Sequence, residues 1–215
     1  MRVLLSFETG GSIFMSTLLD KLLSRDEKVC PWWMAWTFDN PLRKWLHDPQ
    51  QILGPHVKEG MTVADIGCGM GYFSIAMAKM VGPKGKVISI DVQQRMLDLC
   101  RKRAYRAGVS DRIQAIHAAP DNIRVSVPVD FVLAFWMIHE VKDIPRFFGQ
   151  VASVLQPGGE MLYAEPRMHV TQRRFEEIIG YAKAAGFSRE TGPPVKMSRA
   201  VLLYKHTAGK RVHGI

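Results

Sequence analysis

The middle of the chain alternates between short apolar runs and longer amphipathic segments. Short runs bounded by glycine, proline or charged residues are typical of strands, and apolar residues recurring every three or four positions are typical of helices. The expected strands are residues 62–66, 86–90, 113–117, 129–135, 160–164, 188–191 and 200–204. The expected helices are residues 41–53, 72–81, 93–107, 145–155 and 173–185.

This alternation predicts an α/β fold, a Rossmann-like, doubly wound, mostly parallel sheet of seven strands with right-handed crossovers. Residues 129–135 form a continuous apolar run, which suits a parallel strand covered on both faces. Gly192-Pro193-Pro194 lies between the last two strands, in a connection too short for a crossover helix. We therefore expect the sheet to end in an antiparallel hairpin.

A glycine turn joins the first strand to the next helix. Residues 63–74 read VADIGCGMGYFS, with Asp65 followed by Gly67, Gly69 and Gly71. Glycine permits positive φ and close approach of the backbone to a ligand, and a helix start offers free N–H groups. A dinucleotide turn has the pattern G-x-G-x-x-G, with its third glycine one place later, whereas this chain has D-x-G-x-G-x-G. The spacing therefore favours a different cofactor.

A second acid, Asp91, follows the run of residues 86–90 and lies 20 residues after Gly71. An acid at the carboxyl end of the second strand can accept hydrogen bonds from both hydroxyls of a ribose. With these two motifs, the chain resembles the class I S-adenosylmethionine-dependent methyltransferases over residues 42–205. The resemblance implies S-adenosylmethionine as the cofactor and S-adenosylhomocysteine as the product.

The resemblance also implies which residues hold the cofactor. In that family the acid before the turn orients the loop near the ammonium group, and the acid after the second strand holds the ribose. The next positions and the end of the third strand contact adenine, and the end of the fourth strand lies by the methionine part. The residues assigned in this way are Asp65, Gly67, Cys68, Gly69, Gly71, Asp91, Val92, Gln93, Ala118, Ala119, Ala134 and Phe135. Many relatives have an acid for the adenine amino group where this chain has the two alanines, and its nearest acid is Asp121.

Candidate catalytic residues follow the fourth strand, on the expected substrate side. His139 could act as a base or orient the acceptor, with Glu140 beside it; alternatively, either residue caps the next helix or bonds to backbone. Glu165, Arg167 and His169 follow the fifth strand, where they could bind an anionic or polar acceptor, although Arg167 also suits a solvated position. The His-Glu pair is not part of H-E-x-x-H, and we expect no metal.

Composition limits the remaining classes of function. The chain has 215 residues, three cysteines without a C-x-x-C pair, and no apolar run of membrane-spanning length. A reducing cytoplasm is the simplest location. The net charge of +9 is spread along the chain, so nucleic acid is a possible but not a favoured partner. No feature of the sequence indicates an oligomeric state.

The N-terminal quarter differs from the rest. We expect residues 1–54 to form a tail and a short, aromatic-rich helical cap or lid, and residues 55–215 to form the cofactor-binding domain. Four of the five tryptophans lie in residues 30–45, and the lack of a packing pattern before Met15 suggests translation from that methionine. The expected function is methyl transfer by in-line displacement to a small-molecule acceptor. The alternatives are an RNA or protein methyltransferase and a non-catalytic S-adenosylmethionine-binding protein.

Overall fold

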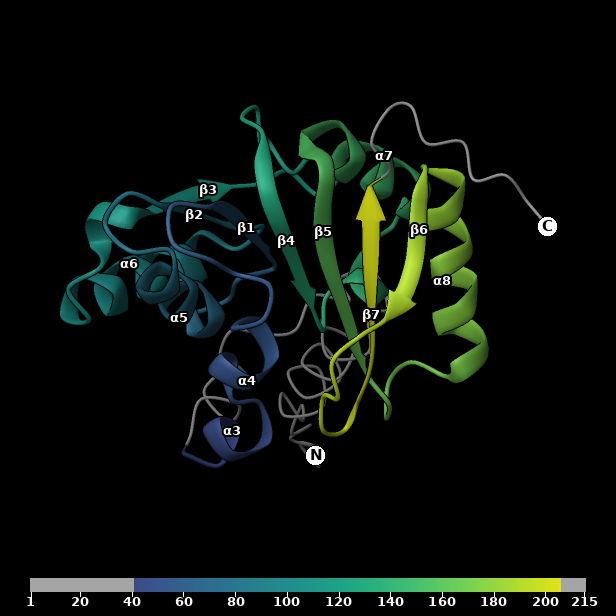
Figure 1. The fold of residues 1–215 in the computed structure, drawn as a ribbon, viewed down its shortest axis with the longest axis horizontal. Coiled ribbons are helices and arrows are strands. Elements are labelled where there is room, and N and C mark those ends of the chain that lie inside the picture. The colour runs from purple at the N-terminus through teal and green to yellow at the C-terminus, as the bar shows by residue number, and fades with distance from the viewer. Residues whose placement is uncertain (1–40, 206–215) are drawn as a thin grey trace, which may run out of the picture. The chain divides into compact units, whose positions relative to one another are not determined.

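The computed structural model describes residues 41–205, which form a seven-stranded sheet with helices on both faces (Figure 1). The strands are β1 (Thr62–Ile66), β2 (Lys86–Asp91), β3 (Ile113–His117), β4 (Val129–Phe135), β5 (Leu155–Pro166), β6 (Phe187–Thr191) and β7 (Ser198–Lys205). The α-helices are α3 (Pro41–Leu46), α4 (Pro49–Leu53), α5 (Tyr72–Met80), α6 (Gln94–Arg106), α7 (Ile144–Val154) and α8 (Gln172–Ala184). Two 3₁₀ helices are η2 (Ser110–Arg112) and η3 (Ile138–Glu140).

The strand order is β3-β2-β1-β4-β5-β7-β6. The first five strands in this order are parallel, and β7 runs antiparallel to both β5 and β6. The predicted sheet and its C-terminal hairpin are therefore confirmed. From β1 the chain first adds strands on one side, β2 and β3, and then on the other side, beginning with β4. Ligands of such sheets bind outside the carboxyl ends of the strands at this switch point between β1 and β4.

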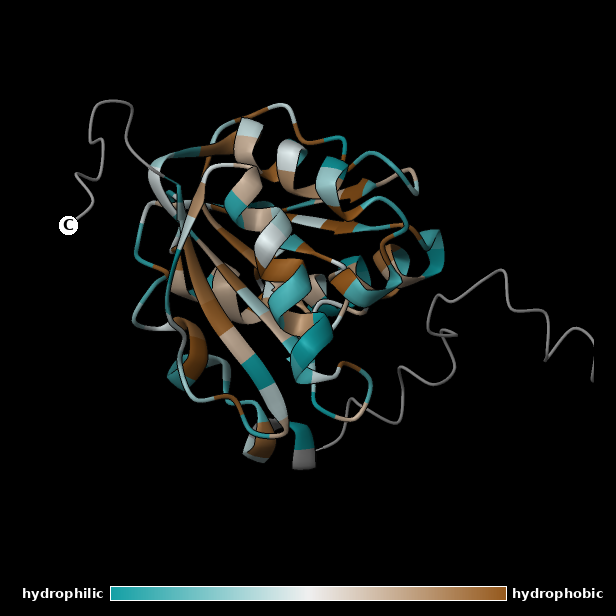
Figure 2. Cartoon of the chain, turned by 90° about the vertical axis from the view of Figure 1, so that its right-hand side faces the viewer, coloured by the Kyte–Doolittle hydropathy of each residue, from teal (hydrophilic) through white to brown (hydrophobic). Residues whose placement is uncertain are grey.

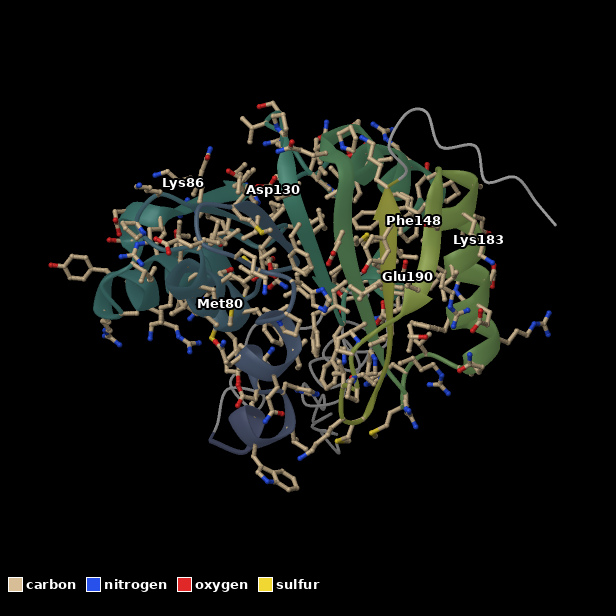
Figure 3. All side chains as sticks on the ribbon, viewed as in Figure 1. Met80, Lys86, Asp130, Phe148, Lys183 and Glu190 are labelled. Atoms are coloured by element: carbon tan, nitrogen blue, oxygen red, sulfur yellow. The ribbon has the colours of Figure 1, made fainter. Side chains whose placement is uncertain are left out.

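The side chains of β4 alternate between two hydrophobic layers. Phe131 and Leu133 pack with residues of α4 and α5, whereas Val132 and Ala134 pack with residues of α7 and α8. A strand buried on both faces has no polar side, which explains the continuous apolar run in its sequence. Figure 2 shows hydrophobic residues concentrated along the strands, and Phe148 of α7 is fully buried there (Figure 3).

Helices α4, α7 and α8 begin where the sequence supplies a side-chain cap. Asp143 accepts a hydrogen bond from the backbone N–H of Arg146 at the start of α7, and Thr171 caps α8 in the same way through Arg174. No helix among residues 41–205 combines the length and the apolar content that a membrane span requires.

The single helix expected over residues 41–53 is wrong, because this segment forms α3 and α4 with a break between them. Pro49 has no N–H group, and a proline disfavours helical geometry in the residue before it. Asp48 accordingly has ψ 114° and accepts a hydrogen bond from the backbone N–H of Gln50, so it caps a new helix. Gly54 ends α4 as expected.

The expected start of the fifth strand at residue 160 is also wrong. Strand β5 starts at Leu155, which pairs with Val129, and the next pair is Glu160 with Phe131. The residues between them therefore form a bulge opposite Asp130, whose side chain accepts a hydrogen bond from Gln156 at 2.9 Å. The expected tail and most of the expected cap, with the proposed start at Met15, lie outside the described residues, and the division at residue 54 stays a prediction.

Candidate functional site

The glycine turn begins directly after β1, at the carboxyl edge of the sheet. Gly67, Gly69 and Gly71 have φ values of 74°, 52° and 81°, which side chains disfavour. The backbone N–H groups of Gly67 and Cys68 both donate to the carbonyl of Ile90, at 2.8 and 2.9 Å. The end of β2 therefore holds the turn in place.

The three glycines serve different purposes. A Cβ atom at Gly67 would lie 2.8 Å from the side chain of Met137, and one at Gly71 would lie 2.5 Å from Sγ of Cys100. These two positions are closed by packing. A Cβ at Gly69 would have no atom within 4 Å, so the backbone there faces open space that a ligand can approach.

Asp91 joins the end of β2 to the glycine turn. One carboxylate oxygen accepts the N–H of Gly69 at 2.9 Å, and the other accepts the N–H of Gln93 at 2.8 Å. Burial raises the pKa of this carboxyl group against the effect of these bonds. The backbone N–H of Val92 also bonds to this carboxylate, and a carboxylate has about four acceptor positions, so about one remains for a hydroxyl group of a ligand.

Asp65 is buried beneath the same turn. Its carboxylate accepts a hydrogen bond of 2.6 Å from the hydroxyl of Ser74 on α5, and that hydroxyl accepts one of 2.8 Å from Ser89 on β2. Burial raises the pKa of Asp65 to about 6. The acid thus fixes the start of α5 against β1 and β2, in agreement with a role in orienting the loop. Its expected proximity to the cofactor's ammonium group stays a prediction.

Cys68 turns its thiol toward Cys100 of α6. Both residues are buried free cysteines, and their thiols hydrogen-bond to each other. This bond, with burial, holds the pKa of the Cys68 thiol well above its usual range. The thiol is therefore protonated at neutral pH, which suits a packing role and not a nucleophile.

The residues expected around adenine lie together beside β2 and β3. Val92 is exposed, and Gln93 is the residue before α6. The N–H of Ala118 donates to the carbonyl of Asp91 at 3.0 Å, and Ala119 forms an isolated bridge with Asn122. These four residues lie next to Asp91, the residue expected to bind the ribose, which is where an adenine ring would have to lie. The nearby acid Asp121 instead pairs with Arg146 at 3.2 Å.

Ala134 and Phe135, the two residues expected beside the methionine part of the cofactor, lie on opposite faces of the sheet. Ala134 is fully buried and belongs to the hydrophobic layer of α7 and α8, so its side chain offers no surface. Phe135 packs on the other face, with its ring centroid 4.6 Å from that of Phe73 and 5.2 Å from that of His47. Phe135 is therefore the better placed of the two for lining a ligand pocket.

His47, between α3 and α4, attaches these helices to the carboxyl edge of the sheet. Its ring lies 4.9 Å from that of Trp136, and its Nε2 donates to the carbonyl of Lys196 at 3.0 Å. Burial lowers the pKa of this imidazole. Trp136 has a φ of 61°, an unusual value for a bulky residue, immediately after β4.

His139 lies in η3, after β4, and contacts the end of β5. Its Nδ1 is 2.6 Å from one oxygen of Glu165, and its backbone N–H donates to the other oxygen at 3.0 Å. The Glu165 side chain is fully buried, whereas 27% of the His139 side chain is exposed. Glu165 thus fixes both the backbone and the ring of His139, and Nε2 is the ring nitrogen left for other partners.

The charge around His139 favours its protonated form. Burial lowers the pKa of the imidazole, but the hydrogen bond and negative charge of Glu165, with the charge of Glu140, raise it by more. Glu140 is 3.9 Å from Nε2, and the ring of His169 stacks at a centroid distance of 6.1 Å. Met137, which packs on Gly67, connects this segment to the glycine turn.

The sequence placed Glu165 only as an acceptor-binding candidate and missed its contact with His139. Both residues follow neighbouring parallel strands, and the carboxyl ends of such strands meet at one edge. That shared position was the available signal. The sequence contains no comparable signal for the packing of His47 on Phe135 and Trp136 or for the contact of Cys68 with Cys100.

Comparisons with known proteins agree with this arrangement. A family described as a methyltransferase domain matches residues 57–188. The demethylmenaquinone methyltransferase of Symbiobacterium thermophilum is 33% identical over 116 residues, which cover 51% of this chain and 44% of that protein. The enzyme of the same name from Listeria welshimeri is 28% identical over 124 residues, covering 55% and 49%. The chain therefore matches only about half the length of these curated relatives.

A solved structure shows the same fold. The S-adenosylmethionine-dependent methyltransferase from Aquifex aeolicus superposes with a TM-score of 0.70 at 24% identity, covering 82% of this chain and 98% of that one. The family match spans more than half of the present chain and includes the glycine turn, Asp91 and His139. The chain therefore belongs to the methyltransferase-domain family, with the fold of the class I S-adenosylmethionine-dependent methyltransferases.

Proposed function

We propose that this protein transfers a methyl group from S-adenosylmethionine to a small-molecule acceptor, with His139 as the general base. The observation that carries the proposal is the His139–Glu165 pair beside the glycine turn. A buried carboxylate that binds Nδ1 fixes the tautomer of the ring and leaves Nε2 to take a proton.

The residues of the turn fit the cofactor. The open space over Gly69 admits a ligand against the backbone, and Asp91 retains acceptor capacity for a ribose hydroxyl. Val92, Gln93, Ala118 and Ala119 would flank adenine, and Phe135 would lie toward the methionine part. S-adenosylmethionine, when bound, would supply a methyl group on a positively charged sulfur that is already a good leaving group.

The chain's own contribution is to position the acceptor and to remove its proton. His139 would accept the proton at Nε2, and the negative charge of Glu165 would stabilise the resulting imidazolium ion. Because those charges raise the pKa of His139, the unprotonated base becomes available at a higher pH than for an ordinary histidine. Glu140, close to Nε2, would orient the acceptor or the ring.

A small-molecule acceptor is supported by the curated relatives, whose name specifies demethylmenaquinone as their substrate. We carry over the class of acceptor and not this compound, because the chain matches about half of their length. An RNA or protein acceptor has weaker support, since the positive charge is spread over the chain and the relatives do not share such a substrate in their names.

The test is transfer of a radiolabelled methyl group to cell extract that has been separated into small molecules, RNA and protein. Label in the small-molecule fraction supports the proposal, and label confined to RNA or protein contradicts the acceptor class. The variant H139A should keep its affinity for S-adenosylmethionine but lose about 10²- to 10⁴-fold in turnover, the usual contribution of a general base. Normal turnover of H139A would leave this histidine a structural role only.

A further inference from the structure

A hollow lies beside the carboxyl edge, between α4, the start of α8 and the loop that joins β6 to β7. It has a volume of about 560 Å³, and neither Gly69 nor Asp91 lines it. Four basic side chains and one acid line this hollow, which we call the basic groove. They are Arg167, Arg189, Lys196, Arg199 and Asp48.

Three of the four basic side chains are held by neutral partners. Arg167 donates through Nε to the carbonyl of Ser198 at 3.0 Å, and Arg199 donates to the carbonyl of Val170 at 2.8 Å. Lys196 donates to the carbonyl of Trp45 at 3.2 Å, with its ammonium group 3.8 Å from the centre of the indole ring. Among residues 41–205, none of the three has a carboxylate partner.

The other two charges in the basic groove are already engaged. Arg189 forms an ion pair of 2.6 Å with Glu176. Asp48 accepts the N–H of Gln50 at 2.9 Å as the cap of α4. Arg167, Lys196 and Arg199 therefore have no direct ion pair in the described part of the chain, and the positive charges of the groove outnumber the single unpaired carboxylate of Asp48.

Such an arrangement suits an anion. The carbonyl bonds fix the stems of the basic side chains, so little side-chain freedom remains to be lost when an anion binds. Arg167 uses only Nε in these bonds and keeps its two terminal nitrogens, which match the paired oxygens of a carboxylate or phosphate.

The basic groove lies next to the proposed transfer site. Arg167 follows Glu165 by two residues, which limits their Cα atoms to a separation of about 7 Å. Trp136 comes directly after β4, and its indole N–H donates to the side-chain hydroxyl of Ser198 at 2.9 Å. The backbone carbonyl of the same serine accepts the hydrogen bond from Arg167. The groove and the residues that carry His139 are therefore joined through Ser198 and Trp136 at the same edge of the sheet.

We infer that the methyl acceptor carries an anionic group, a carboxylate or a phosphate, which Arg167, Lys196 and Arg199 bind in the basic groove. This inference rests on the proposed function, because it assigns the groove to the substrate of that reaction. It gives the net positive charge of the chain a local purpose beyond general solvation.

Calorimetric titration with inorganic pyrophosphate and, separately, with benzoate tests the inference at constant ionic strength. The wild-type protein should bind at least one of them, and the one bound more tightly identifies the group as phosphate or carboxylate. The double variant R167Q/K196Q should bind it about tenfold more weakly or worse, since two charge-assisted contacts are lost. R167K/K196R, which keeps both charges but loses the guanidinium fork at position 167, should have an affinity between those of the wild type and R167Q/K196Q.

The matched control is K183Q. Lys183 lies in α8 and points into solvent (Figure 3), about 16 Å along the helix from Gln172 at the groove. The K183Q substitution removes one positive charge outside the groove and should leave the affinity for the anion unchanged. Weakening by K183Q that is as large, per charge removed, as weakening by the double variant would mean diffuse electrostatic attraction and would overturn the inference, as would the absence of binding of either anion. Salt-resistant displacement of the anion by a single-stranded RNA would assign the groove to nucleic acid and overturn it too.

Titration with S-adenosylmethionine separates this inference from the proposed function. Intact cofactor affinity in R167Q/K196Q shows that the variant is folded. A wild-type protein that binds the cofactor but neither anion refutes the groove alone, whereas failure to bind the cofactor refutes the proposed function. In the labelled small-molecule extract, the acceptor should be retained on an anion exchanger; methylated product arising only from the unretained fraction would contradict an anionic acceptor.

Discussion

Replacing Asp65 with asparagine should reduce the dependence of folding stability on pH. Asp65 is buried under the glycine turn, with the hydroxyl of Ser74 donating to it, and burial raises its pKa from the ordinary 3.8 to about 6. The folded protein therefore holds this proton more tightly than the unfolded chain. Ionisation of Asp65 then lowers the free energy of unfolding as the pH rises.

The magnitude follows from the two pKa values. At about 1.4 kcal/mol for each pH unit between 3.8 and about 6, the full loss is about 3 kcal/mol. The loss begins near the unfolded pKa and is complete above the folded one. Between about pH 4.5 and pH 7.5, about 2 kcal/mol of it should develop.

Urea denaturation of the wild type and of D65N at these two pH values measures the effect. The difference in unfolding free energy between the two proteins should change by about 2 kcal/mol in favour of D65N at the higher pH. An unsatisfied amide N–H in the variant would lower its stability equally at both pH values and so cancels from this change.

The control is D98N, which removes an exposed acid that pairs with Arg101 at 2.9 Å. Its effect should stay within about 0.5 kcal/mol at both pH values, as for other surface pairs. If the difference between D65N and the wild type is the same at both pH values, Asp65 is not held in a desolvated position and this reasoning fails.

Two further predictions concern the proposed base and the turn. In E165Q, loss of the negative charge should lower the pKa of His139, so the acidic limb of the profile of kcat/KM against pH should move to lower pH; an unmoved limb would show that His139 is not the titrating base. G71A should lower the free energy of unfolding, measured by urea denaturation, by about 2–4 kcal/mol, because the new Cβ would clash with Sγ of Cys100 and φ at this position is positive. G69A, with free space for a Cβ, should lose only about 1–2 kcal/mol yet bind S-adenosylmethionine less tightly, and equal instability of the two variants would contradict the packing argument.

The strands were predictable because glycine and proline separate them and because buried parallel strands have a distinctive composition. Strands β1, β3 and β4 have the expected bounds. The helical pattern over residues 41–53 misled the prediction, although Asp48 before Pro49 is itself a helix-start signal. There, the local geometry of proline outweighs the apolar periodicity across the break.

The candidate site was partly predictable for a related reason. The glycine turn and Asp91 are defined by local sequence, and the hydrogen bond from Gly69 to Asp91 joins them. The pair of His139 and Glu165 depends instead on which strands are neighbours and on the directions of two side chains, which no local pattern specifies. The basic groove similarly combines residues from α4, α8, β6, β7 and the loop between these two strands.

The most direct test of the account is calorimetric titration of the full chain with S-adenosylmethionine, S-adenosylhomocysteine and NAD, in parallel with D91A. The account predicts micromolar binding of the two sulfur nucleosides, no binding of NAD, and affinity about 10- to 100-fold weaker in D91A, as charged hydrogen bonds to the ribose are lost. Binding of NAD alone, or unchanged affinity in D91A, would contradict the assignment of the glycine turn and Asp91 to this cofactor.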